Sequence, residues 1–72
     1  MRFAAVYEKT KTGWSAYIPD LPGLGVAGST MRETRKLLRE AVLLHVEDMR
    51  ATGQPIPKPR SQADYLEVRL KA

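Results

Sequence analysis

One long amphipathic helix restricts the fold of this 72-residue chain more than any other feature of its sequence. Thr30 and Glu33 have the spacing of a capping box, in which each side chain accepts a backbone N–H of the first helical turn. Gly53 is typical of the position that follows the end of a helix. The pattern predicts a helix over residues 31–52, about 33 Å long at 1.5 Å per residue. A helix of that length needs a surface to cover.

The expected helix has an apolar stripe on one side. At 100° per residue, the stripe comprises Thr34, Leu37, Leu38, Ala41, Val42, His45 and Met49. Leu43 and Val46 lie outside the stripe, so they are candidates for an interface between subunits, with plain exposure as the alternative. His45 lies near the centre of the stripe. Because the chain has no Cys and no second His to act with it, we interpret His45 as packed at the core edge rather than as a general base or a pH switch.

Three short strands are expected before the helix and one after it. Alternation of apolar side chains predicts strands over residues 2–8, 14–18, 24–27 and 65–70. The Pro-rich residues 54–59 read as an extended, semi-rigid connector. The order β-β-β-α-β predicts an α+β two-layer sandwich, with an antiparallel sheet covered on one face by the helix. We expect a single domain over residues 1–72.

The sequence contains neither a disulfide nor a Cys/His metal site that could stabilise the fold. It contains no Cys and one His, which excludes disulfides and the usual Cys/His zinc sites. Domains of this size bury only about 60–65% of their unfolded surface and usually gain stability from a disulfide, a metal or a subunit contact. We therefore expect no metal and no cofactor, and we expect self-association into a dimer or tetramer or binding to a protein partner.

Charge and hydropathy exclude several classes of function. Twelve Lys and Arg residues against eight Asp and Glu give a net charge of +4, without the basic run that is typical of a nucleic-acid-binding arm. No apolar run approaches the ~20 residues of a membrane span. Glu8 interrupts the first apolar segment, so we expect no signal peptide and a cytoplasmic location.

An active site is not expected. The strand interiors carry almost no acidic residues, and Gly23-Leu24-Gly25 lacks the following helix that a dinucleotide site requires. We expect a protein that is not an enzyme, with a degenerate hydrolase as a remaining alternative.

Four basic residues gather in the first half of the helix: Arg32, Arg35, Lys36 and Arg39. Like charges four positions apart repel each other, and cations near a helix N-terminus oppose the helix dipole. The cluster is either an anion-facing surface or a solvated face. A stand-alone nucleic-acid-binding module that uses this face and Tyr17 is the alternative function.

The segment over residues 13–23 contains the densest group of aromatic, proline and glycine residues in the sequence. It reads as a strand that ends in a rigid corner over residues 19–23, and the strand edge beside this corner can accept another chain by strand addition. The predicted partner-binding residues are Trp14, Tyr17, Pro19, Asp20, Leu21, Pro22, Gly23, Arg35 and Arg39.

Three motifs resemble one known family. They are Gly13-Trp14-x-Ala16-x-Ile18-Pro19-Asp20-Leu21-Pro22-Gly23, Gly28-Ser29-Thr30-x-x-Glu33 and Gly53-x-x-Ile56-Pro57-x-Pro59. In this order and spacing they are similar to the HicB-like antitoxin domain of bacterial toxin–antitoxin pairs. The resemblance implies a reduced ribonuclease-H-like fold without nuclease activity. It also implies assembly into dimers or tetramers and binding to a HicA-type mRNA-cleaving toxin, whose RNA-binding and catalytic surface the antitoxin blocks. Full antitoxins of this kind usually carry a C-terminal DNA-binding segment, and none is expected within these 72 residues.

Overall fold

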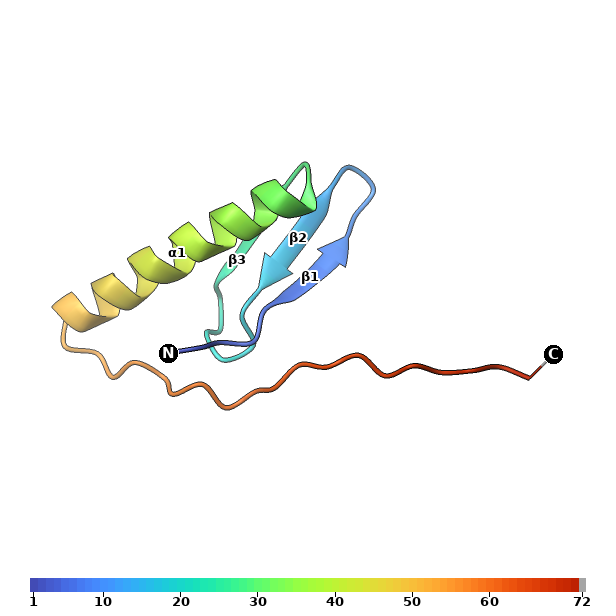
Figure 1. Ribbon diagram of the computed structural model, residues 1–72. Coiled ribbons are helices and arrows are strands. Elements are labelled where there is room, and N and C mark those ends of the chain that lie inside the picture. The colour runs from blue at the N-terminus through green and yellow to red at the C-terminus, as the bar shows by residue number, and fades with distance from the viewer. Residues whose placement is uncertain (72) are drawn as a thin grey trace.

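The computed structural model describes residues 1–71 and shows a small sheet covered by one helix. The elements are β1 (Val6–Lys9), β2 (Trp14–Tyr17), β3 (Gly25–Gly28) and α1 (Met31–Ala51). The strands form an antiparallel sheet in the order β1-β2-β3. Helix α1 crosses one face of this sheet and packs on β3 and β2 (Figure 1). The predicted α+β class, an antiparallel sheet with one long helix on one face, is confirmed.

The first strand is shorter than predicted, since β1 begins at Val6 and not at residue 2. Val6 pairs with Tyr17, the last residue of β2. Beyond Tyr17 the corner with Pro19 and Pro22 turns the chain away, and prolines have no N–H to donate to a ladder. Residues 2–5 therefore have no strand to pair with on that side.

Helix α1 begins where the capping box predicts. The N–H of Glu33 donates to the Thr30 hydroxyl oxygen at 3.0 Å, and Thr30 has the extended backbone of an N-cap residue. The reciprocal bond, in which the Thr30 N–H would donate to the Glu33 carboxylate, does not form within residues 1–71. One half of the capping box is thus formed.

The helix ends one residue earlier than predicted, at Ala51. Gly53 follows with a positive φ of 74°. The N–H of Gln54 donates to the Met49 carbonyl at 2.8 Å, and the N–H of Gly53 donates to the Arg50 carbonyl at 3.3 Å. These two bonds form a Schellman motif, which explains why the chain needs a glycine at this point.

The hydrophobic core lies between α1 and the sheet and is small. Its buried apolar residues are Ala16, Ile18, Leu21 and Leu38, with Phe3, Ala5, Tyr7, Leu24, Val26 and Val42 packed around them. The expected helix stripe faces this core: Thr34 and Leu38 are buried, and the remaining stripe residues are half-buried. Outside the stripe, Leu43 is 60% exposed, whereas Val46 is half-buried. Leu44 is an exposed apolar residue that sequence reasoning missed.

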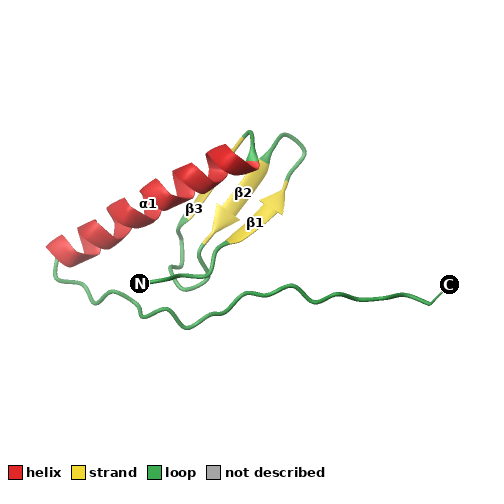
Figure 2. Ribbon diagram, in the orientation of Figure 1, coloured by secondary structure: helices red, strands yellow, loops and turns green. Residues whose placement is uncertain are grey.

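The fourth strand expected over residues 65–70 does not form. After Gly53, the chain over residues 54–71, here called the tail, runs as an extended segment that leaves the sheet (Figures 1 and 2). A strand needs a partner ladder, and residues 65–70 lie against none. The radius of gyration is 14.7 Å, whereas a compact chain of this length has about 11 Å. The tail accounts for this elongated shape.

Candidate partner-binding surfaces

The corner over residues 19–23 is fixed by local hydrogen bonds. The N–H of Leu21 donates to the Ile18 carbonyl at 3.0 Å, and the N–H of Leu24 donates to the Leu21 carbonyl at 3.3 Å. Gly23 has a positive φ of 84°, which other residues adopt at a cost. Leu21 is only 1% exposed, so its side chain anchors the corner in the core and does not reach the surface. Pro19, Pro22 and Gly23 form the exposed part.

Asp20 holds the tail against the corner. Its Oδ2 accepts the backbone N–H groups of Arg60 and Ser61, both at 2.8 Å, and its Oδ1 accepts the Ser61 hydroxyl at 2.8 Å. The hydrogen bonds from the Ser61 backbone, the Arg60 backbone and the Ser61 side chain lower the pKa of Asp20 below its ordinary value. We call this contact the Asp20 clasp. Sequence reasoning placed Asp20 among partner contacts, and the structure gives its carboxylate partners within the chain.

Trp14 and Tyr17 do not form one patch. Ala16 lies in the core under α1, and successive residues of a strand face opposite sides of a sheet. Trp14 therefore lies on the helix side, where the Lys9 ammonium is 5.0 Å from its ring centroid. Tyr17 is 42% exposed and lies on the side away from the helix. Alternation over residues 14–18 predicts that Trp14 and Tyr17 lie on opposite faces of the strand, and the structure agrees. The sequence did not establish which of these two faces the helix covers.

The basic residues of α1 do come together. Arg32, Arg35, Lys36 and Arg39 line a shallow hollow with Thr30 and Glu33. Within residues 1–71 the one ion pair joins Arg69 and Glu67 in the tail, at 3.7 Å. Arg35 and Arg39 are exposed, so their charges are directed to solvent. This hollow lies on the helix and is separate from Tyr17 on the outer sheet face.

A second surface, which sequence reasoning did not identify, lies at the free edge of β1. It is a groove of about 300 Å³ between the first strand and α1, here called the β1-side groove. Its apolar lining comprises Met1, Phe3, Ala5, Tyr7, Ile18, Leu38 and Val42, and Arg35 and Arg39 complete it. The alternation of Phe3, Ala5 and Tyr7 is visible in the sequence. The sequence does not show that the groove stays open, because this depends on the path of the tail.

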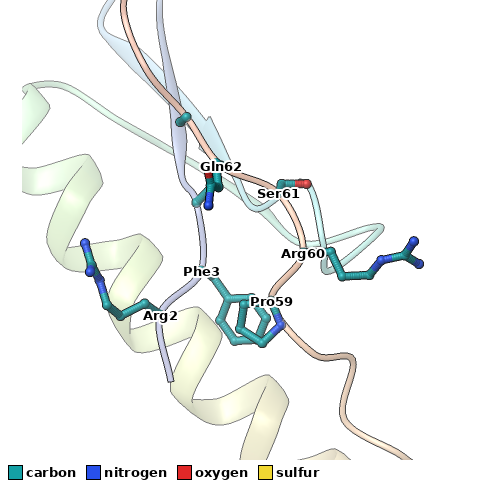
Figure 3. Close-up of a pocket in the computed structure, with 8 residues that line it drawn as sticks. Arg2, Phe3, Pro59, Arg60, Ser61 and Gln62 are labelled. Atoms are coloured by element: carbon teal, nitrogen blue, oxygen red, sulfur yellow. The ribbon is translucent and has the colours of Figure 1, made fainter.

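The tail and the N-terminal segment border another hollow, shown in Figure 3. Residues 2–4 lie on one side of it and residues 59–63 on the other. Figure 3 shows the two segments running in the same direction, from Arg2 to Phe3 and from Pro59 to Gln62.

Among residues 1–71, no three His, Cys, Asp or Glu side chains are close enough together to hold a metal ion. Over the same residues, α1 lacks the apolar length that crossing a membrane would require.

Comparison with known proteins decides the family. Residues 3–69 match the model of the HicB-like antitoxin of bacterial toxin–antitoxin systems. The chain belongs to the HicB-like antitoxin family. This agrees with the resemblance of the three sequence motifs and with the order of strands and helix.

The relatives of this HicB-like chain are longer than it is. A chain in the structure of the HicA3 and HicB3 toxin–antitoxin complex is similar to it, with a TM-score of 0.66 and 34% identity, over 78% of this chain and 65% of that chain. An uncharacterized 14.9 kDa protein from the rep-hol intergenic region of Haemophilus phage HP1 is 30% identical over 66 residues. That match covers 92% of this chain and half of the phage protein.

Proposed function

We propose that this HicB-like chain acts as a non-enzymatic antitoxin module in the bacterial cytoplasm. In this role it binds a HicA-type mRNA-cleaving toxin and covers the toxin's RNA-binding surface. The proposal also includes self-association of the chain. The observation that carries it is the structural similarity to a chain from the HicA3 and HicB3 complex, at 34% identity and a TM-score of 0.66. Membership of an antitoxin family supports the same role.

The surface proposed for the toxin combines the exposed part of the corner with the adjacent Tyr17. Pro19, Pro22 and Gly23 are exposed, and Tyr17 is 42% exposed on the outer sheet face. Prolines fix the backbone before binding, so little conformational entropy is lost on association. Tyrosine is enriched among residues that dominate binding energy at protein interfaces.

The experiment is a titration of this chain with a purified HicA-type toxin. We expect a stoichiometric complex by calorimetry and loss of mRNA cleavage once the antitoxin is in equal amount. Tyr17→Ala should weaken binding by about tenfold or more, as truncation of an anchor residue does. Thr12→Ala, at the exposed hairpin turn, is the matched control and should bind like the wild type. Full cleavage in the presence of excess antitoxin would refute the proposal.

Nucleic-acid binding is the second candidate, and one observation favours it. The four cations of α1 line one hollow, and no carboxylate of residues 1–71 forms an ion pair with them. If they bind phosphates, the logarithm of RNA affinity should fall linearly with the logarithm of salt concentration. Replacing Arg35 and Arg39 by Gln should then lower that slope by about 0.7 for each lost contact to single-stranded RNA. An RNA affinity that does not change with salt rejects this candidate.

A further inference from the structure

We infer that two copies of this chain associate by exchanging their tails. Residues 65–70 of each copy, here called the tail strand, pair with the free edge of β1 in the other copy and cover its β1-side groove. The inference rests on the self-association proposed above and specifies the surface that produces it.

The receiving side is an open sheet edge beside an apolar groove. β1 pairs with β2 on one side, and no strand of residues 1–71 pairs with its other side. An unpaired strand edge is a template for a further strand. Phe3, Ala5 and Tyr7 line the adjoining groove at every second position, so an added strand with the same period would complete the layer under α1.

The tail strand has the complementary pattern. Leu66, Val68 and Leu70 recur at every second position and are 90%, 70% and 89% exposed. Glu67 and Arg69 occupy the alternate positions and form an ion pair with each other. A segment with one apolar and one charged face suits a strand that is buried on one side. In one isolated copy this apolar face covers nothing.

The path of the tail favours a second copy over the chain's own edge. The Asp20 clasp fixes the tail at Arg60 and Ser61, and the connector before it is stiffened by Pro55, Pro57 and Pro59. The tail passes residues 2–4 in the same direction (Figure 3) and then continues away from β1 (Figure 1). Residues 62–71 can span about 33 Å at 3.3 Å per residue, which is enough to reach a neighbouring copy.

The chain exposes more surface than a compact monomer of its mass, and the excess matches the area that a dimer interface of this kind would bury. The chain exposes 6403 Å², whereas a compact monomer of 8.1 kDa exposes about 4,500 Å². The excess is about 1,900 Å² in each copy, or about 3,800 Å² in two copies, which lies within the range of about 2,000–5,000 Å² of total area that obligate homodimers bury. A reciprocal exchange would use this excess twice, once in each copy.

The first test is the oligomeric state of the full chain in analytical ultracentrifugation. We expect a dimer for the wild type. Val68→Pro removes the apolar side chain at the centre of the tail strand's apolar face and disrupts the strand backbone, so it should raise the dimer dissociation constant by about tenfold or more. Lys71→Pro introduces a proline one residue beyond the tail strand and should leave the dimer intact. Retention of the α1 signal in circular dichroism shows that each variant is folded.

The second test separates exchange from folding back onto the same copy. Dimers are prepared with one isotope-labelled and one unlabelled chain, and nuclear Overhauser effects are filtered for contacts between the two. Contacts between the Val68 methyl groups of one copy and the Tyr7 ring of the other support exchange. Contacts only within one copy, or a dimer that Val68→Pro leaves unchanged, overturn the exchange but leave self-association standing. A monomeric wild type overturns both, while toxin binding is measured independently.

Discussion

Two residues, Gly28 and Asp20, determine how closely separate parts of the fold approach each other. A Cβ atom on Gly28 would lie 2.6 Å from the Thr34 hydroxyl oxygen and 3.0 Å from the Thr34 backbone nitrogen. Thr34 is fully buried, and its hydroxyl donates to the Thr30 carbonyl at 2.7 Å. The end of β3 and the first turn of α1 can therefore approach this closely only because position 28 has no side chain.

Gly28→Ala should destabilise the protein by about 1–3 kcal/mol, because the added methyl group forces the helix away from the sheet. Urea unfolding monitored by the fluorescence of Trp14 measures the change. Ala27→Ser, at an exposed position of the same strand, should change the free energy of unfolding by less than about 0.5 kcal/mol. A neutral Gly28→Ala would show that α1 can move away from β3 without cost.

Asp20 gives the attachment of the tail a pH dependence. Its pKa is lowered in the folded state by the hydrogen bonds from Ser61 and Arg60. The contribution of the clasp is therefore complete above the ordinary carboxyl pKa and is lost as the pH falls below about 4, through the lowered folded value. We expect the amide NMR signals of Arg60 and Ser61 to move toward random-coil positions in that range. In Asp20→Asn they should be displaced at neutral pH and show no acid transition. If the Arg60 and Ser61 amide signals change with pH in the same way in the wild type and in Asp20→Asn, the clasp is contradicted.

At the scale of elements, helix α1 was predicted within one residue at each end, because its signals are local. Thr30 caps the first turn and Gly53 ends the last one, and each acts through backbone groups only a few positions away. The strands were less well predicted, because a strand's limits depend on its neighbour. β1 starts at Val6 only because its partner β2 ends at Tyr17.

Thr30→Ala should cost about 0.5–2 kcal/mol of stability, since the N–H of Glu33 loses its acceptor. Thermal unfolding followed at the helical circular-dichroism band measures the loss. Thr30→Ser keeps the hydroxyl and should remain close to the wild type. Equal losses in both variants would mean that packing of the threonine methyl group, not capping, is the source of the stability.

For the whole molecule, the balance between core and surface is the main physical fact. Four buried apolar residues form the core centre, while four large apolar residues of the tail are exposed: Tyr65, Leu66, Val68 and Leu70. A domain of this size has little stability to spare when it stands alone. The need for a further polypeptide stays a prediction, and this balance supports it.

If association supplies part of the stability, the melting temperature should depend on concentration. We expect it to rise by on the order of a few degrees for each tenfold increase in wild-type concentration. Scanning calorimetry over two decades of concentration measures this. Val68→Pro should shift this dependence to concentrations about tenfold higher or more, because its dimer is weaker. A wild-type melting temperature that is equally constant would show that one copy is stable by itself.

The sequence by itself determined the features that are encoded over a few neighbouring residues. These are the helix and its caps, the three-stranded meander, the rigid corner and the motifs of the HicB-like family. Only the tertiary structure decided that Leu21 is a core anchor, that α1 covers the sheet face of Trp14 and Ala16, and that Asp20 binds Arg60 and Ser61, 40 and 41 positions away. It also showed that the tail strand does not lie in its own sheet. The physical reason is that alternation specifies which face of a strand is apolar, whereas pairing depends on which edge, in which copy, the chain can reach.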